Sequence, residues 1–496
     1  MDVLGGEQYR LVRVVFQRGL ALLYLLAFLV AANQFRALAG EDGLLQIDRF
    51  VDRWSFRERP SLFHFAPTDR AAGTAAWTGV ALSVVALTGV PDFLPSPYAV
   101  PASMALWAVL WGLYLSFANA GQTFWGYGWE TMLTETGFLA IFLGAGDAGA
   151  PVVVVFLLRW LLFRNMFGAG LIKLRGDDCW RDLTAMDYHY ETQPMPNPGS
   201  WFAHHLPERF HRVETFGNHV VELLVPFLYF APQPFAALAG VATIGFQAWL
   251  MLTGNFSWLN ALTIVLATST FSDVVLADWL PFLDTTGVAV AAAPVPLYLT
   301  ALSVLLAVVV LALSVKPVQN MLSESQVMNT SFDPLNLVNT YGAFGSITRE
   351  RYEIVVQGTH DDPDSEDAEW RTYAFKGKPT DPHRRPPQIA PYHLRLDWQM
   401  WFAAMSPTPR RSPWFPRFLE KLLEGDEATL DLLAENPFPD GPPEYVRAVR
   451  YRYRFTTPEE RSETGKWWER ERANAYVRPV SLDDLRHQYP PGRRRR

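Results

Sequence analysis

Long apolar segments separated by short polar ones run from near the N-terminus to about Val315. Three of them carry no charged residue and reach the roughly 20 residues that cross a bilayer, at 71–90, 235–254 and 294–315. Further apolar segments lie at 14–32, 98–118, 151–174, 213–231 and 256–280, and another follows a turn at "NAGQ" and ends near Gly144. This pattern predicts a multi-pass α-helical membrane bundle of about eight or nine spans over residues 1–315.

The sequence after Val315 has a different pattern and is rich in charged residues and proline. Apolar and polar residues alternate in "RYEIVVQGT", "RTYAFKG" and "YVRAVRYRYRFTT", as in half-buried strands, whereas "LRLDWQMWFAAM" and "PRFLEKLLEG" have helical spacing. These segments predict a soluble α+β domain with a small antiparallel sheet or sandwich over residues 341–496. Residues 316–340 are expected to link this domain to the bundle.

Composition narrows the class of protein. A net charge of −7 argues against nucleic-acid binding, and the final "RRRR" at 493–496 is expected to be a solvated tail. The single cysteine, Cys179, excludes an intrachain disulfide and a cysteine-built zinc site, and we predict no cofactor. Because nearly all basic residues are arginine, the coding sequence is expected to be GC-rich and prokaryotic. A prokaryotic protein of this kind would lie in the cell membrane, with the lipid bilayer as one partner.

Five charged residues fall inside the predicted spans: Glu130, Glu135, Arg159, Arg164 and Glu222. Each would cost about 2.5–3.5 kcal/mol at the centre of the bilayer, so these side chains are expected to face the inside of the bundle. Since two acids lie on one span and two arginines on the next, ion pairs between helices are predicted. Such pairs could serve merely to hold the helices in register. Alternatively, they could line a polar cavity.

Lys173 is the third basic residue of the span that carries Arg159 and Arg164. At about 100° per residue, Arg159 and Lys173 return to within about 40° of the same helix face, so both could line one cavity. Gly168 to Gly170, "GAG", would let a neighbouring helix or a ligand approach closely. Lys173 could lose its proton there and act as a base, or it could lie at the interface and extend towards the headgroups.

The polar loop, residues 173–217, is the most unusual segment between spans. It carries many of the chain's histidines, but their spacing matches no standard zinc pattern, so no metal is predicted. The prolines of "QPMPNPGSWF" favour an extended conformation. We expect the loop to cap the bundle and either to cover a cavity or to bind a client. The candidate binding residues are Asp187, Tyr188, His189, Tyr190, Glu191, Gln193, Pro194, His204 and His205.

Several long motifs carry a resemblance to a known family. They are "GQTFWGYGWETMLTETGFLAIF", "LTAMDYHYETQPMPNPGSWFAHHLPERFHR", "NTYGAFGSITRERYEIVVQGT" and "HRRPPQIAPYHLRLDWQMWFAA". With them the chain resembles the lipase maturation factor family. In animals that family consists of multi-pass endoplasmic-reticulum proteins, chaperones of protein maturation that help homodimeric lipases such as lipoprotein lipase to fold and assemble. The resemblance implies a lipase-like protein client and a membrane-bound assistant without a chemical step of its own.

A shorter resemblance supports an alternative function. "AGLIKL" followed by Trp180 is similar to a segment of the vitamin K-dependent carboxylases, in whose membrane domain a lysine at the place of Lys173 serves as the base. This resemblance implies an enzyme in which Lys173 is the base and Arg159 and Arg164 hold an anion in an intramembrane cavity. Because it covers little of the chain, we favour the assistant over the enzyme.

Overall fold

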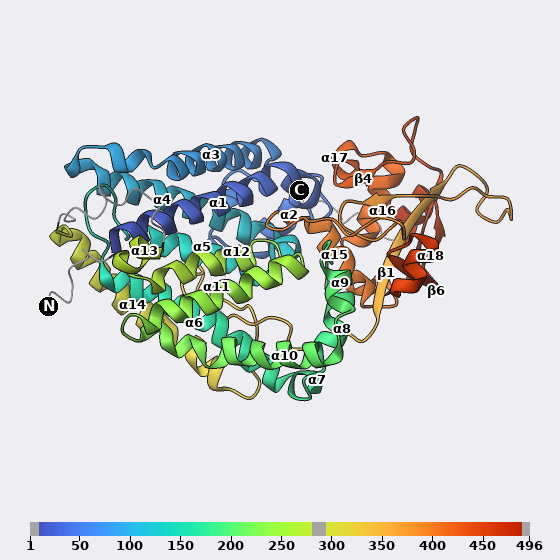
Figure 1. Ribbon diagram of the computed structural model, residues 1–496. Helices are drawn as coiled ribbons and strands as arrows, with labels where there is room; N and C mark the ends of the chain where they lie inside the picture. The colour runs from blue at the N-terminus through green and yellow to red at the C-terminus, as the bar shows by residue number, and fades with distance from the viewer. Residues whose placement is uncertain (1–8, 280–293, 489–496) are drawn as a thin grey trace.

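The computed structural model describes residues 9–279 and 294–488. In the described part, the six helices that are long and apolar enough to cross a membrane are α1 (Arg10–Ala39), α3 (Asp69–Thr88), α4 (Ser96–Ala120), α6 (Val152–Arg175), α11 (Phe235–Thr253) and α14 (Leu297–Leu322). They run beside one another as a bundle that fills the left and centre of Figure 1. The predicted multi-pass membrane bundle is therefore confirmed, and the protein is an integral membrane protein. Residue 280, where the span predicted to start at 256 was expected to end, lies outside the described residues, as does the arginine tail at 493–496.

The number of such helices is near the prediction but lower, for three local reasons. The segment that ends near Gly144 holds only the short helix α5 (Gly128–Ala140). In the segment 213–231, α10 (Glu208–Leu223) gives way to the 3-10 turn η5 (Val225–Phe230), where Pro226 cannot continue an α-helix. In the segment 256–280, α12 (Leu259–Ala267) with η6 (Thr268–Thr270) meets α13 (Asp273–Trp279) at 113°, so this bent pair would add a seventh span if it is counted as one.

Close packing between α1 and α3 depends on a small residue. A Cβ atom at Gly79 of α3 would lie 2.3 Å from the ring of Phe28 on α1. Glycine therefore lets the aromatic ring lie directly against the neighbouring backbone. The ring of Phe28 also meets Tyr24 and Tyr114, so α1, α3 and α4 share one aromatic core.

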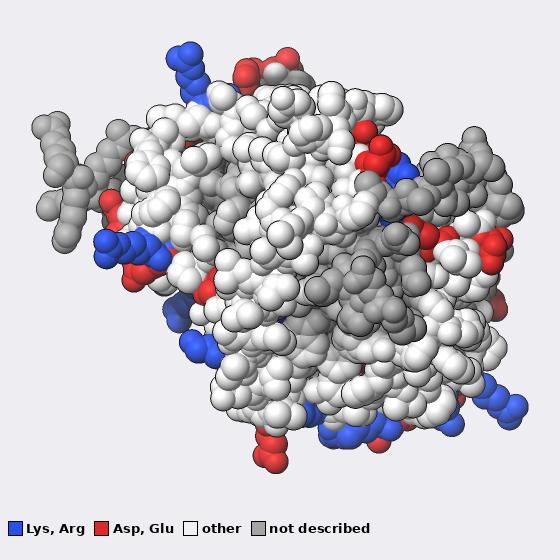
Figure 2. Space-filling view, turned by 90° about the vertical axis from the view of Figure 1, so that its left-hand side faces the viewer, with Lys and Arg blue, Asp and Glu red and all other residues white. Residues whose placement is uncertain are grey.

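Short elements cover the end of the bundle that faces the soluble domain (Figure 1). They are α2 (Ile47–Arg53), η2 (Leu62–His64), η4 (Gln122–Trp125), α7 (Asp178–Arg181), α8 (Ala185–Thr192) and α9 (Ser200–His204), while η3 (Val90–Phe93) connects α3 to α4. Figure 2 looks at the opposite end of the bundle, where most of the visible surface is uncharged and charged side chains gather towards the edges of the view.

The segment 323–347 follows α14 and returns to the bundle. Gln326 donates to the carbonyl of Gly168 on α6 at 3.1 Å, and Tyr341 donates to Glu135 on α5 at 2.6 Å. The segment includes part of the expected linker 316–340, of which residues 316–322 belong to α14. Its contacts place the chain against α5 and α6 before the soluble domain begins.

The soluble domain contains a four-stranded antiparallel sheet in the order β2-β1-β5-β6. Its strands are β1 (Arg351–Thr359), β2 (Arg371–Thr372), β5 (Tyr445–Phe455) and β6 (Trp468–Val480), and a second small sheet pairs β3 (Ala374–Phe375) with β4 (Leu433–Glu435). Val355 of β1 lies opposite Val449 of β5, which sets the central register. The predicted α+β class is confirmed.

Helices complete the soluble domain, namely α15 (Arg395–Ala404), η7 (Pro409–Arg411), α16 (Phe415–Glu424), α17 (Glu427–Leu430), α18 (Pro458–Thr464) and α19 (Leu482–Gln488). Phe415 and Phe418 of α16 pack on Tyr476 of β6 and on Phe375 of β3, with ring centres 5.2 and 6.0 Å apart. The domain lies at one end of the bundle, on the right of Figure 1.

Hydrogen bonds to backbone groups dock the soluble domain on the bundle. The Gln34 side chain of α1 donates to the carbonyl of His393 at 2.7 Å and accepts from the N–H of Arg395 at 3.0 Å. Asn255, which follows α11, accepts from the N–H groups of Ile389 and Ala390 at 2.9 and 2.8 Å. Because both amide side chains are buried, these bonds satisfy groups that would otherwise be costly to desolvate.

Candidate functional site

The polar loop folds at the end of the bundle that meets the soluble domain. It contains α7, α8 and α9 and the first turns of α10, so it is more helical than the sequence indicated. Residues 193–199 are not helical, as the prolines predicted, whereas Ser200 already begins α9. Asp177 accepts from the N–H of Cys179 at 3.2 Å and caps α7.

Two side-chain pairs fasten α8 to α10. Asp187 Oδ1 lies 2.9 Å from His211 Nδ1, and the Tyr190 hydroxyl donates to Glu214. The Trp249 indole of α11 donates to the same Glu214 at 2.6 Å. Asp187 and Tyr190 therefore hold α8 against two helices of the bundle.

Glu191 and Pro194 face the soluble domain, and Gln193 lies between the two parts of the molecule. The N–H of Phe455 in β5 donates to Glu191 Oε2 at 2.7 Å, and burial raises the pKa of this carboxyl. Arg351 of β1 donates to the carbonyls of Glu191 at 3.0 Å and of Pro194 at 3.3 Å. Gln193 donates to the carbonyl of Thr253 at the end of α11 at 2.9 Å. These residues thus join the bundle to the sheet.

His204, His205 and Tyr188 lie in partly exposed surroundings. His204 Nε2 is 3.8 Å from Glu191 Oε2, and burial lowers the pKa of His204 to about 4. His205 Nδ1 lies 2.7 Å from the carbonyl of Trp201. The guanidinium of Arg349 lies 4.7 Å from the ring centre of Tyr188. In the described part of the chain, no three His, Cys, Asp or Glu side chains come close enough to hold a metal ion.

A small buried chamber lies beneath the polar loop and contains Lys173 and His189. Its volume is about 60 Å³, and its other polar lining residues are Asn165, Asn218, Glu222, Gln247, Asn260 and Thr263. Lys173 Nζ donates to Glu222 at 2.6 Å and to Asn218 at 3.0 Å, and it lies 4.8 Å from the ring centre of Trp180. Burial, with a smaller effect of Lys173, lowers the pKa of His189 to about 3. Arg159 does not line this chamber.

The predicted ion pair between the two charged spans exists once. Glu135 of α5 pairs with Arg164 of α6, and both side chains are almost fully buried. Glu135 also accepts from the Tyr341 hydroxyl at 2.6 Å and from the backbone and side-chain nitrogens of Asn339 at 3.1 and 3.0 Å. This carboxylate therefore connects α5, α6 and the segment 323–347.

Glu130 and Arg159 have other partners. Glu130 accepts from Arg395 of the soluble domain at 2.9 Å and from the Tyr114 hydroxyl. Arg159 donates to the carbonyl of Ser269 in η6 at 2.8 Å and to that of Tyr229 in η5 at 3.1 Å. Both carbonyls belong to 3-10 turns, which leave these backbone oxygens available. As predicted, the five charged side chains are buried within the protein: Glu130, Glu135, Arg159, Arg164 and Glu222.

Sequence reasoning missed the residues of the soluble domain that complete these contacts. Arg395 and Arg351 are fully buried and reach the bundle and the polar loop. Both stand in motifs that the family resemblance already singled out, "HLRLDW" and "RERYEI". The available signal was a charged residue beside apolar residues in such a motif. The neighbouring sequence, however, does not show which distant residue is its partner.

Two family descriptions match the chain. The lipase maturation factor transmembrane domain matches residues 11–278, and the lipase maturation factor C-terminal domain matches residues 337–478. Residues 279–336, which include the membrane helix α14, lie between the two matched segments. No solved structure matches the chain significantly.

Curated relatives match over nearly the whole length. Lipase maturation factor 1 of Homo sapiens is 44% identical over 96% of this chain and 89% of its own length, and that of Bos taurus is 43% identical over 97% and 91%. Lipase maturation factor 2 of Homo sapiens is 30% identical over 96% of this chain and 83% of its own length. With both domains matched and this identity across the chain, the protein belongs to the lipase maturation factor family.

Proposed function

We propose that this chain is a membrane-bound folding and assembly assistant whose clients are lipases or other exported proteins. The observation that carries the proposal is the match to lipase maturation factors over 96% of the chain. We place the protein in the membrane across which its clients are exported, which is the cell membrane in a prokaryote.

The geometry supports different roles for the buried and the exposed residues of the polar loop. His189, Tyr190 and Gln193 are buried, so they hold the loop in shape between the bundle and the sheet. On its outer surface, Phe202 of α9 and Phe210 of α10 expose 49% and 41% of their area. Exposed aromatic residues on a rigid support are suited to bind apolar surface of an incompletely assembled client. We infer that the client binds this outer surface.

A secretion assay tests this function. Lipoprotein lipase serves as the probe client in cells that lack their own maturation factor, with this chain expressed in the endoplasmic reticulum. The chain should raise the ratio of lipase activity to lipase protein in the medium. Tyr188→Ala and His189→Ala should each abolish the increase, because the first removes the contact with Arg349 and the second opens the chamber beneath the loop.

The matched controls are Asp364→Ala and Asp367→Ala in the exposed loop between β1 and β2, which should leave lipase activity unchanged. Membrane content of each variant, measured by quantitative blotting, separates loss of function from loss of protein. Full activity of both loop variants at normal levels would refute the role of the polar loop. An inactive wild-type chain would refute the choice of client.

The enzyme alternative depends on Lys173, and its surroundings favour a structural role. Two of the N–H groups of Lys173 are already engaged by Glu222 and Asn218, and a chamber of about 60 Å³ holds a few water molecules. The alternative predicts that Lys173→Met loses activity while the lipase still coprecipitates with the chain. Joint loss of activity and binding, or a normal variant, would reject it.

A further inference from the structure

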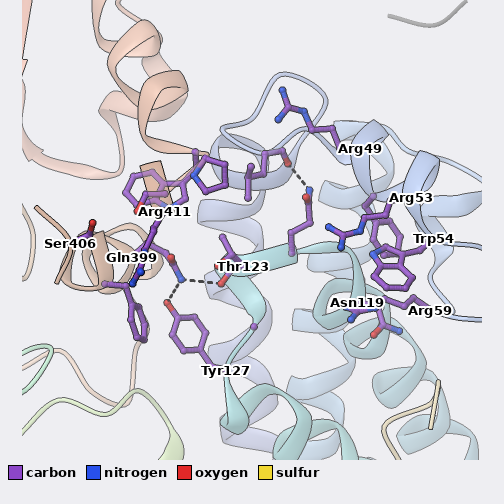
Figure 3. Close-up of a pocket in the computed structure, with 18 of the residues that line it drawn as sticks. Arg49, Arg53, Trp54, Arg59, Asn119, Thr123, Tyr127, Gln399, Ser406 and Arg411 are labelled. Atoms are coloured by element: carbon purple, nitrogen blue, oxygen red, sulfur yellow. Dashed lines mark hydrogen bonds between the residues drawn. The ribbon is translucent and has the colours of Figure 1, made fainter. Parts of the chain in front are cut away.

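A second, larger cavity lies away from the polar loop, between the first connection of the bundle and the soluble domain (Figure 3). Its volume is about 800 Å³. One wall is formed by α2 and the residues after it, the floor by the end of α4 and by η4, and the other wall by α15 and the turn before α16. We call this cavity the arginine cleft, after the residues described next.

Four arginines line the arginine cleft: Arg49, Arg53, Arg59 and Arg411. In Figure 3, Arg411 lies across the cleft from the three arginines of the first connection. Among the described residues, none of the four has a carboxylate oxygen within 4 Å, in contrast to Arg164 and Arg395, which pair with Glu135 and Glu130. Arg53 and Arg59 both lie over Trp54, with guanidinium carbons 5.2 and 4.5 Å from the ring centre.

The acids of the same connection do not neutralise the cleft. These acids, Glu41, Asp42, Asp48, Asp52 and Glu58, are absent from the lining. Asp42 pairs with Arg417 and Lys421 instead, and Glu58 accepts from the N–H and hydroxyl of Ser55 at 3.0 and 2.7 Å. Burial and the neighbouring charge of Arg53 lower the pKa of Arg59. The four arginines are exposed, and like charges gathered without a counter-charge repel one another, so the cleft favours an anion.

The position of the cleft indicates which anion. Its floor contains Asn119 and Gln122, where α4 ends, and the wall that bears three of its arginines belongs to the connection between the end of α1 and the start of α3. We therefore place the cleft at the bilayer surface, near the ends of these membrane helices. Phe56 and Phe65 of the same connection expose 48% and 75% of their area, which is apolar surface suited to contact with lipid.

We propose that the arginine cleft binds the phosphate group of an anionic phospholipid. Guanidinium groups form paired hydrogen bonds with phosphate oxygens, and several of them at the membrane surface favour anionic lipids. Gln122, Asn119 and Ser406 line the remaining space, in which the glycerol part can lie. The exposed aromatic residues beside the cleft favour a lipid over an acidic protein segment. This binding goes beyond the proposed client function and does not depend on it.

The test compares two triple variants of the full chain in neutral detergent. One carries Arg49→Gln, Arg53→Gln and Arg59→Gln, and the control carries Arg57→Gln, Arg70→Gln and Arg410→Gln, exposed arginines outside the cleft with the same change of charge. The melting temperature is titrated with dioctanoyl phosphatidylglycerol, dioctanoyl phosphatidylcholine, inorganic phosphate and a glutamate-rich peptide. Lipid retained after purification is identified by native mass spectrometry.

Phosphatidylglycerol should stabilise the wild type and the control equally, and the cleft variant should need at least about tenfold more lipid for the same shift. Arg411→Gln should weaken binding by a smaller factor from the opposite wall, and it serves if the triple variant does not fold. Equal effects of phosphatidylcholine, of inorganic phosphate alone or of the peptide would overturn the proposal. So would an equal loss in the control variant, since binding would then follow overall charge.

Discussion

Glu130 and Glu135 lie on the same short helix, α5, and both are buried, yet their surroundings differ. Glu135 accepts hydrogen bonds from Arg164, Tyr341 and both nitrogens of Asn339. The side-chain donors to Glu130 in the described structure are only Arg395 and Tyr114. Glu135 thus joins elements within the bundle, whereas Glu130 holds the soluble domain in place.

The difference teaches that two buried carboxylates on one helix can differ in how much stability is lost when their cationic partner is removed. A buried ion pair contributes little compared with apolar residues of the same shape, but loss of one partner leaves a charge without compensation. The remaining hydrogen-bond donors then decide how costly that charge becomes. Glu135 keeps several donors after loss of its arginine, and Glu130 keeps one.

Arg395→Met should therefore have the largest effect. It leaves Glu130 with the Tyr114 hydroxyl and should lower the free energy of unfolding by about 3–5 kcal/mol. Thermal unfolding in detergent, followed by tryptophan fluorescence, measures the loss, and limited proteolysis should release the soluble domain from the bundle. The double variant Glu130→Gln with Arg395→Met should recover most of the stability. A single variant as stable as the wild type would show that the pair does not hold the two parts together.

Arg164→Met should have a smaller effect, about 3 kcal/mol or less, because Tyr341 and Asn339 still donate to Glu135. The same unfolding measurement applies, and proteolysis should leave the soluble domain attached. The order of the two arginine variants is the decisive result. If Arg164→Met were the more damaging, the number of remaining donors would not explain the cost.

The smallest effect is expected from pH, through His393, whose Nδ1 lies 3.6 Å from Glu130 Oε1. Burial, with the charge of Arg395, lowers the pKa of this histidine from 6.5 to about 4 in the folded protein, so the unfolded chain binds its proton first as the pH falls. Below pH 6.5 this histidine therefore lowers the free energy of unfolding, by about 2 kcal/mol at pH 5. Its ring packs on Tyr127 and Trp129 at 4.8 and 5.3 Å, so phenylalanine should fit.

His393→Phe should leave stability near pH 8 almost unchanged and make its decline between pH 6.5 and 5 shallower. Unfolding curves of the wild type and the variant across this range provide the measurement. Parallel curves for His393→Phe and the wild type would contradict the assignment of the titration to this residue.

Local patterns sufficed to predict much of the fold. Apolar length alone marked α3, α11 and α14, and alternation marked β1 and β5. The cost of charge in lipid predicted that the five charged residues of the spans are buried, and it predicted ion pairs between the two charged spans, of which the structure shows Glu135 with Arg164. These features depend on the sequence nearby or on adjacent helices.

Other features depend on contacts that no local pattern encodes. The strand β6 is an edge strand with exposed charged residues, "WERERANAYV", so it lacks the alternation of a half-buried strand. The partner of Glu130 lies 265 residues later in the chain. The fold of the polar loop around α8 depends likewise on α10, α11 and β5, because its side chains are satisfied by these elements.

The contact between Glu130 and Arg395 also bears on how the protein is made. At about 5–20 residues per second, synthesis of the 265 residues between the two partners takes tens of seconds. Throughout that time Glu130 has no arginine partner, because Arg395 has not yet been synthesised. A copy truncated before Arg395 therefore cannot form this contact between the bundle and the soluble domain.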